Sequence, residues 1–197
     1  ELQDACRTVI INGRERMYLV RRPENALNPA PVVMYFHGGG GSAVQTYTTS
    51  GFNELADREG FIAVYPTGIG RHWNDGREAG KLQAQREDAD DVAFVRAVVE
   101  ALAGEFVIDR SRIFATGVSN GGIMSHRLAA EASDIFAAVA PVVAGMAEPI
   151  AASFSPAHPV SLLVIQGAAD PLVPINGGAI VRPGSGRGEV IAMEDAV

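Results

Sequence analysis

Five short apolar runs, bounded by turn-forming residues, alternate along this chain with helical patterns. They cover residues 31–36, 61–65, 112–116, 136–143 and 160–166. Continuous apolar runs of this length are typical of strands buried on both faces, as in a parallel sheet. Strands that alternate with helices predict an α/β fold with a mainly parallel sheet.

The helical patterns have recognisable ends. Residues 53–58 predict a short helix closed by Gly60, and residues 121–131 predict another. A longer helix, expected to stop at Gly104, follows from apolar residues at helical spacing: Val92, Val95, Val98, Val99 and Leu102. Near the N-terminus, Asn12-Gly13 between runs 7–11 and 17–20 predicts a β-hairpin.

Composition excludes several classes of protein. The chain has 197 residues, which we interpret as one domain, 1–197, and its 47% hydrophobic content is too high for a disordered chain. No apolar stretch approaches the ~20 residues of a membrane span. The 23 acidic against 16 basic residues disfavour nucleic-acid binding. Cys6 is the only cysteine, so it is either an inert small hydrophobe or the partner of a cysteine outside this chain.

A nucleophile motif lies between the predicted strand 112–116 and the predicted helix 121–131. Gly117-Val118-Ser119-Asn120-Gly121 fits G-x-S-x-G in the strand–turn–helix setting that lifts a serine above a sheet. Glycines at both ends remove side chains that would clash with the neighbouring strand and helix. The alternative is a glycine-rich helix start capped by Ser119.

A glycine run supplies a candidate oxyanion hole. His37-Gly38-Gly39-Gly40-Gly41 follows the predicted strand 31–36, where backbone N–H groups can face a ligand without Cβ interference. We expect the two oxyanion donors to be the N–H groups of Gly39 and Asn120. A phosphate-binding loop is disfavoured, because neither G-x-G-x-x-G before a helix nor G-K-[ST] is present.

Asp170 is the candidate acid, because it follows the predicted strand 160–166 at the same sheet edge as Ser119. The order Ser then Asp matches α/β-hydrolases, and the alternative is an ordinary turn aspartate. No histidine follows it. His158 precedes that strand and is expected roughly 20 Å away at the opposite edge. His126 is expected about 10 Å along the helix from Ser119.

The two remaining histidines are poor candidates for the base as well. We expect His37 to support the glycine loop, which leaves His72, on a sheet-edge loop, as a weak candidate. The base is therefore expected in a segment absent from this chain. Residues 191–197 read as the start of a helix, so we also expect the domain to lack a C-terminal helix, a last strand and the histidine loop.

The chain resembles the polyhydroxybutyrate depolymerase and feruloyl esterase group of α/β-hydrolases in six segments: HGGGGSA, VYPTG, RHWNDGR, DADDVAFVRAVVEAL, RIFATGVSNGG and QGAADPLVPING. The resemblance implies an α/β-hydrolase fold with helices on both faces of the sheet. It implies a serine carboxylesterase, secreted or periplasmic, that cleaves aromatic, acetyl or hydroxyacyl esters, including those of plant polysaccharides. Ser119 would be the nucleophile and Asp170 the acid, with Gly39 and Asn120 as the oxyanion hole.

The resemblance also places further residues near the site. Gly38, Trp73 and Asn74 would line its mouth, although core packing is the alternative for Trp73. Asp90 and Asp91 match a family segment, and we interpret them as the acidic first turn of a helix. A cysteine near the family's C-terminal end would be the partner of Cys6. No metal or organic cofactor is implied, since metal and nucleotide motifs are absent.

Two other functions stay open at this stage. A non-catalytic member of the same fold that only binds carbohydrate or polyester is favoured by the missing histidine and disfavoured by the intact motif at Ser119. A peptidase on the same scaffold is the second alternative, since no residue of the sequence separates amide from ester substrates.

Overall fold

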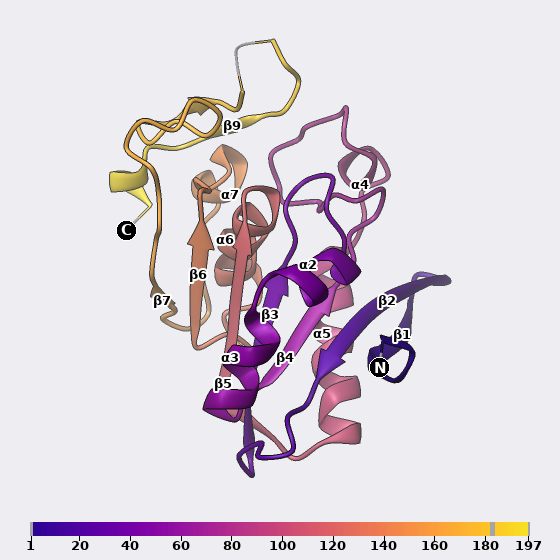
Figure 1. Cartoon of the computed structure of the whole chain (residues 1–197). Coiled ribbons are helices and arrows are strands. Elements are labelled where there is room, and N and C mark those ends of the chain that lie inside the picture. The colour runs from indigo at the N-terminus through magenta and orange to yellow at the C-terminus, as the bar shows by residue number, and fades with distance from the viewer. Residues whose placement is uncertain (1, 182–183, 197) are drawn as a thin grey trace.

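The apolar runs assemble into a seven-stranded sheet with the strand order β1-β2-β4-β3-β5-β6-β7. The computed structural model describes residues 2–181 and 184–196 (Figure 1). The strands are β1 (Cys6–Ile11), β2 (Arg14–Arg21), β3 (Ala30–Phe36), β4 (Ile62–Pro66), β5 (Ile108–Val118), β6 (Ala138–Val142) and β7 (Ser161–Leu162). A separate antiparallel pair is formed by β8 (Gly178–Ala179) and β9 (Glu189–Val190).

The sheet is parallel from β4 to β7, as the sequence predicts. β3 pairs in parallel with β4 and β5, and β6 continues the parallel ladder from β5 to β7. Every residue of β4 is buried, which explains its unbroken apolar sequence. The carboxyl ends of β3, β5 and β6 therefore meet at one sheet edge.

The N-terminal hairpin forms the other edge region. β1 and β2 pair antiparallel through a two-residue turn at Asn12 and Gly13, which have φ of 50° and 77°. Positive φ at both positions is the geometry of a type I′ turn, for which Asn-Gly is the preferred sequence. The predicted hairpin is thus confirmed. Cys6 opens β1 and is exposed.

Helices cover both faces of the sheet. α2 (Ala43–Thr49) and α3 (Phe52–Glu59) lie in front of β3 and β4, and α5 (Asp91–Glu105) lies behind (Figure 1). α6 (Asn120–Glu131) packs on β5 and β6. Shorter helical segments are α1 (Leu2–Ala5), α4 (Gln83–Arg86), α7 (Glu148–Ala152) and the 3₁₀ turn η1 (Met193–Asp195). This arrangement is the predicted α/β class.

Several predicted boundaries need correction. Gly104 does not end its helix, because α5 continues to Glu105 before Phe106 turns to an extended conformation. Gly60 closes α3 as expected, with φ of 75°. The predicted strand 160–166 is a regular strand only at β7, followed by a single bridge from Ile165 to Val142. The helix expected to start at residue 191 is only the single turn η1, and Val197 lies outside the described residues.

One half of the sheet is less well covered than the other. α6 packs on one face of β5 and β6, and no other helix among the described residues makes comparable contact with them. On the opposite face, Phe114, Thr116 and Ala140 are only partly buried. Beyond β7, Leu163 and Ile165 are 62% and 54% exposed. Apolar surface is therefore accessible beside the strand that carries Ser119.

Candidate active site

Ser119 occupies a sharp turn between β5 and α6. Its φ of 54° and ψ of −119° lie in a region that non-glycine residues rarely adopt. The N–H of Ser119 donates to the carbonyl of Val142 at 2.9 Å, and its own carbonyl accepts from Ile123 at 2.9 Å. The strained residue is thus fixed by the neighbouring strand and by the first turn of α6. Its hydroxyl is partly exposed and has no hydrogen-bond partner within the described ranges.

The glycines that flank this turn are required by close backbone approach. A Cβ on Gly121 would lie 2.1 Å from the carbonyl oxygen of Phe36 and 2.6 Å from that of His37. A Cβ on Gly117 would lie 2.6 Å from the backbone of Gly121 and 2.7 Å from the oxygen of Phe36. Both contacts are far shorter than van der Waals distance, and the obstacles are backbone atoms. The predicted reason for the two glycines is therefore borne out.

The glycine loop lies directly against this turn. A Cβ on Gly38 would be 4.0 Å from the Cβ of Ser119, and one on Gly39 would be 3.7 Å from the Cβ of Asn120. The loop is closed by a bond from the Gly41 N–H to the Gly38 carbonyl, and the Gly40 N–H donates to the Arg71 carbonyl, both at 2.9 Å. The structure thus brings four of the predicted site residues together.

The two N–H groups predicted as oxyanion donors are available. Within the part of the chain that the structure describes, neither the Gly39 N–H nor the Asn120 N–H has a hydrogen-bond partner. Asn120 is the first residue of α6, where the helix dipole adds partial positive charge. Two unpaired donors beside a hydroxyl are suited to stabilise the tetrahedral intermediate of acyl transfer.

His37 supports the loop through both of its ring nitrogens. Nδ1 lies 2.8 Å from the Gly38 carbonyl, which can only accept, so Nδ1 carries the proton. Nε2 accepts from the Gly68 N–H at 3.0 Å. The ring is buried, and burial lowers the pKa of His37. This neutral histidine has no free lone pair for catalysis, as expected for a supporting residue.

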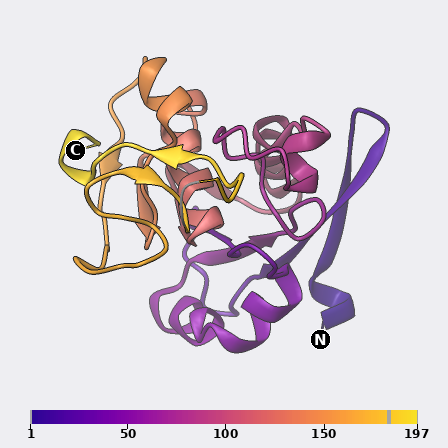
Figure 2. The ribbon, with the colours of Figure 1, turned by 90° about the horizontal axis from the view of Figure 1, so that it is seen from above.

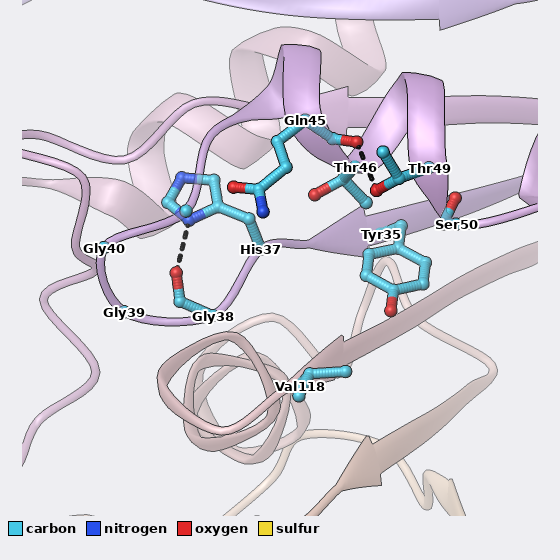
Figure 3. A pocket seen from close by; sticks show the side chains of 11 residues that line it. Tyr35, His37, Gly38, Gly39, Gly40, Gln45, Thr46, Thr49, Ser50 and Val118 are labelled. Carbon is cyan, nitrogen blue, oxygen red and sulfur yellow. Dashed lines mark hydrogen bonds between the residues drawn. The ribbon is translucent and has the colours of Figure 1, made fainter.

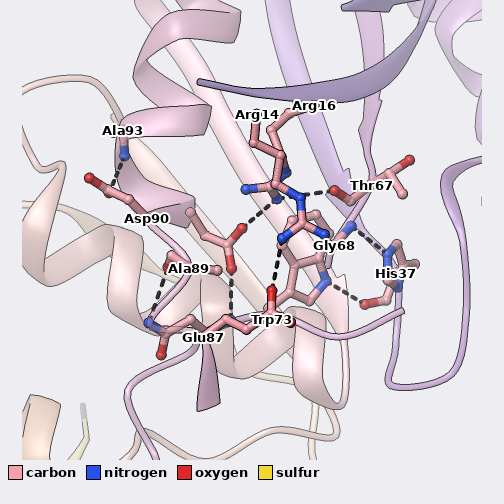
Figure 4. Close-up of polar contacts among 12 residues, drawn as sticks. Arg14, Arg16, His37, Thr67, Gly68, Trp73, Glu87, Ala89, Asp90 and Ala93 are labelled. Atoms are coloured by element: carbon pink, nitrogen blue, oxygen red, sulfur yellow. Dashed lines mark hydrogen bonds and ion pairs between the residues drawn. The ribbon is translucent and has the colours of Figure 1, made fainter. Parts of the chain in front are cut away.

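Trp73 lies beside His37, behind the glycine loop (Figure 4), and both Trp73 and Asn74 are buried. The Trp73 side chain is fully buried, packs edge-on against Phe36 at 5.2 Å, and donates from its indole N–H to the His37 carbonyl at 2.9 Å. The amide of Asn74 donates to the Ala89 carbonyl. Their burial corrects the predicted contact with substrate and supports the packing alternative for Trp73.

A buried polar network holds the side chain of Asn120. Its side-chain oxygen accepts from the Trp73 N–H at 2.9 Å, and its amide nitrogen donates to Asp75. Asp75 is fully buried, and it pairs with Arg77 at 2.8 Å and accepts from Gln85 at 2.8 Å. Sequence analysis did not identify Asp75, Arg77 or Gln85. The available signal was the Asp-x-Arg spacing within RHWNDGR.

A second buried ion pair fixes the start of α5. Asp91 is fully buried, pairs with Arg16 at 2.6 Å and accepts from the Asn74 N–H at 2.7 Å. Burial raises the pKa of Asp91, against the opposing effect of Arg16. Asp90 accepts from the Ala93 N–H and is the N-cap, as the interpretation of an acidic first turn requires. Asp91 has the further task of tying the loop to β2.

A hollow of about 380 Å³ opens between the glycine loop and α2 (Figure 3). Gly38 lines it, as predicted for a substrate-binding residue. Polar and apolar atoms contribute about equally to its wall, and its other lining residues are Tyr35, His37, Gly39, Gly40, Gly41, Gln45, Thr46, Thr49, Ser50 and Val118. Sequence analysis missed α2 and its contribution. The signal was Ser42, which accepts from the Gln45 N–H as the helix cap.

Asp170 lies on the loop that follows the bridge at Ile165. Ile165 pairs with Val142, whose carbonyl binds Ser119, so the three segments end at one sheet edge. One carboxylate oxygen of Asp170 accepts from the N–H groups of Leu172 and Val173, at 2.8 and 3.1 Å. These bonds, with the Leu172 bond the strongest, lower the pKa of Asp170.

The second oxygen of Asp170 has more freedom. Among the described residues, its one hydrogen-bond partner is the Gln166 side-chain amide, which donates to it at 3.4 Å. Asp170 is thus a turn residue through one oxygen and an accessible carboxylate through the other. Both interpretations made from the sequence apply to it, and an orienting role for a histidine stays a prediction.

No described histidine hydrogen-bonds to Ser119 or Asp170. His126 is fully buried, with Nε2 3.3 Å from the Ala144 carbonyl and Nδ1 unpaired. His158 is exposed beside Ser133, at the far end of α6 from Ser119. His72 lies against Gly39, and its Nδ1 is 2.9 Å from the Gly70 carbonyl.

Other site types are not seen among the described residues. They contain no group of three or more His, Cys, Asp or Glu side chains that could hold a metal ion. Their helices are too short or too polar to cross a membrane.

Known proteins resemble this chain in sequence. The profile of the prolyl oligopeptidase family matches residues 49–155. The protein named "Putative esterase NocK" from Nocardia uniformis subsp. tsuyamanensis is 40% identical over 178 residues, which cover 87% of this chain and 50% of NocK. Feruloyl esterase B from Piromyces equi is 32% identical over 155 residues, which cover 76% of this chain and 28% of that protein. The matched part of the chain thus spans half or less of the length of each of these two relatives.

Solved structures support the fold. Acetyl xylan esterase from Aspergillus awamori superposes with a TM-score of 0.62 at 22% identity, covering 76% of this chain and 54% of that one. The complex of pOPH_S172A with pNPB has a TM-score of 0.69 at 17% identity, covering 97% of this chain and 72% of that one. At these identities the likeness concerns the α/β-hydrolase fold alone.

Gly121→Ala tests the close approach at the turn. The added Cβ would collide with two backbone carbonyls, so we expect unfolding to be easier by about 3 kcal/mol or more. The matched control is Gly104→Ala, inside α5, where nothing lies within 4 Å of the new Cβ. That change should stabilise by about 0.5–1 kcal/mol. Urea unfolding of both variants checks this; equal effects would contradict the tight contact.

His126→Leu tests the buried, neutral histidine through pH dependence. Burial lowers the pKa of His126 from 6.5 to about 4. Below pH 6.5 the unfolded chain binds a proton that the folded chain refuses, so the wild type should lose about 2 kcal/mol of stability between pH 7 and pH 5. The variant should lack this component of the loss.

Urea unfolding at the two pH values measures the difference. The control is His158→Gln, a change at an exposed histidine, which should keep the wild-type dependence. If His126→Leu keeps it as well, His126 is not held neutral by burial.

Proposed function

The chain belongs to the prolyl oligopeptidase family, whose profile matches more than half of it, and on that premise we propose that it is the Ser119-bearing part of a serine carboxylesterase. The observation that carries the proposal is the strained turn at Ser119, with a free hydroxyl facing the glycine loop and two unpaired N–H groups. Strain at a single residue persists where the surroundings impose it, and it clusters at functional sites.

The proposed reaction follows from this geometry. The Ser119 oxygen attacks the ester carbonyl, and the negative charge on the carbonyl oxygen is stabilised by the N–H groups of Gly39 and Asn120. The carbon–oxygen bond to the alcohol breaks, and an acyl-enzyme forms. Water then attacks the acyl group, and the acid leaves. A histidine takes the proton of Ser119 and returns it to the leaving alcohol, with Asp170 holding the ring.

We further propose that this histidine lies outside the 197 residues. His37 uses both ring nitrogens within the glycine loop, and His126 is enclosed in the core. His158 is at the far end of α6. His72 donates from Nδ1 to a backbone carbonyl, so it cannot donate the same proton to Asp170.

The substrate class is proposed from relatives and from the hollow beside Gly38. Relatives are named feruloyl esterase and acetylxylan esterase, which supports aromatic and acetyl esters, including those linked to polysaccharides. Hydroxyacyl esters, as in polyhydroxybutyrate, belong to the same proposal. The hydroxyl and amide groups of Tyr35, Gln45 and Thr49 suit an acyl group with polar substituents. Esters of plant polysaccharides lie outside the cells that degrade them, so we propose a secreted or periplasmic enzyme.

A peptidase is the second candidate, and the family description favours it. Amide cleavage would use the same nucleophile and oxyanion donors, so the geometry alone does not separate the two. Comparing the rates at which an ester and an amide of the same acyl group are cleaved decides between an esterase and a peptidase. A binding protein without catalysis would bind such substrates and never acylate Ser119.

The test is acylation of Ser119 by an activated ester. With p-nitrophenyl butyrate, the 197-residue chain should release at most a slow burst of about one equivalent of nitrophenol. Imidazole added to the buffer should accelerate the reaction, because it replaces the missing base. Ser119→Ala should reduce release to the rate with imidazole alone. It should leave the melting temperature within about 2 °C, since the hydroxyl has no hydrogen bond to any described residue.

Two outcomes would contradict parts of this account. Activity that survives Ser119→Ala would exclude Ser119 as the nucleophile. Full turnover by the chain without imidazole would show that a base is present within it. In that case His72→Gln tells whether His72 is that base.

A further inference from the structure

A second hollow, of about 530 Å³, is lined in part by His72, the residue that lies against Gly39 of the glycine loop. Its walls come from the loop 67–90 and from the segment that leads to β9, which run close together when the molecule is seen from above (Figure 2). The Arg77 side chain links the two by donating to the Arg187 carbonyl at 3.1 Å. Described residues that line this basic cleft are His72, Lys81, Leu82, Val181, Gly184, Ser185 and Arg187.

The charged side chains that line the basic cleft are all cationic. Lys81 and Arg187 lie there, and no described carboxylate is within 4.0 Å of either head group. Elsewhere, arginines such as Arg96 and Arg110 pair with a carboxylate at 2.7 Å. In a chain with net charge −7, these two cations thus share one hollow without a carboxylate partner among the described residues. Like charges left side by side are stabilised when an anion binds between them.

The Lys81 side chain is held toward Arg187 by packing. A Cβ on Gly186 would lie 3.1 Å from Cε and 3.2 Å from Cδ of Lys81, so the Lys81 stem runs along the backbone next to Arg187. The backbone of Arg187 is in turn fixed by Arg77, which is paired with the buried Asp75. Asp75 also binds Asn120. The far wall of the cleft is thus attached to the network that orients a proposed oxyanion donor.

His72 joins the basic cleft to the glycine loop. A Cβ on Gly39 would be 3.2 Å from Cδ2 and 3.3 Å from Nε2 of His72. Because Nδ1 donates to the Gly70 carbonyl, Nε2 has a lone pair available. Nε2 has no hydrogen-bond partner among the described residues. A molecule bound to Ser119 can therefore extend past His72 to Lys81 and Arg187.

We propose that the basic cleft binds a carboxylate carried by the substrate, so that the enzyme prefers esters with a negatively charged acyl or alcohol part. This inference rests on the proposed esterase function. Arg187 offers a planar fork that suits a carboxylate, and Lys81 adds a second charge. The ester group lies at Ser119, and the uncharged end of the substrate occupies the hollow beside Tyr35.

Binding is tested without catalysis, so that it does not depend on the esterase proposal. Glutarate and its uncharged analogue glutaramide are titrated separately into the protein and followed by ¹H–¹⁵N NMR. Glutarate should shift the amide signals around His72 and Lys81, and glutaramide should bind at least about tenfold more weakly. The variant Lys81→Gln with Arg187→Gln should weaken glutarate binding about tenfold.

Two controls make the binding result specific. Arg110→Gln removes one exposed cation at the opposite end of β5 and should leave glutarate binding unchanged. Ser119→Ala should bind glutarate like the wild type, because binding needs no nucleophile. Equal binding of glutarate and glutaramide, or equal weakening by Arg110→Gln, would overturn the proposal.

Acylation rates then distinguish the two ends of the ester. In the presence of imidazole, mono-p-nitrophenyl glutarate is compared with p-nitrophenyl butyrate for the acyl end, and 4-carboxyphenyl butyrate with phenyl butyrate for the alcohol end. In the double variant, one charged ester should lose about tenfold in acylation rate, and the neutral esters should change less than twofold. If the double variant loses acylation rate with neither of the charged esters, the proposed substrate preference is wrong. If the wild type acylates with no ester at all, the esterase proposal fails while the glutarate titration still decides on the cleft.

Discussion

The geometry of the site depends on one close backbone approach. The Cα of Gly121 packs against the carbonyl oxygens of Phe36 and His37, where any side chain would collide. This contact brings the first turn of α6 against the end of β3. Because the glycine loop begins where β3 ends, the same contact places Gly38 and Gly39 beside Ser119 and Asn120. The Ser119 hydroxyl and the N–H groups of Gly39 and Asn120, which have no hydrogen-bond partner among the described residues, therefore lie together before any substrate binds.

Buried charge holds the surrounding loop in place. The loop 67–90 has little regular structure, yet it carries Trp73 under the glycine loop and Asp75 under Asn120. Two ion pairs that are almost fully enclosed, Asp75 with Arg77 and Asp91 with Arg16, fix it. Breaking such a pair leaves an uncompensated buried charge, which costs several kcal/mol. The same network reaches Arg187, so the proposed oxyanion hole and the basic cleft share one support.

Local sequence patterns predicted the alternation of strands and helices, the hairpin at Asn12-Gly13 and the turn at Ser119, because each of these depends on residues that are neighbours in the chain. The strand predicted over residues 160–166 was too long, because β6 pairs regularly with only Ser161 and Leu162 of this apolar run. Trp73 was expected at the mouth of the site, with core packing as the alternative, and the sequence did not decide between them because its burial depends on His37 and Phe36, which are distant in sequence. The basic cleft was not predicted either, because it needs Lys81 and Arg187 from separate segments.

The central claim is that Ser119, Gly39 and Asn120 form one acyl-transfer site. A crystal structure of the chain after treatment with a fluorophosphonate, with imidazole present, tests it most directly. The account predicts phosphorus bound to the Ser119 oxygen, with one phosphonyl oxygen about 2.7–3.1 Å from the main-chain nitrogens of both Gly39 and Asn120. An adduct on a different side chain, or a phosphonyl oxygen turned away from both nitrogens, would contradict it.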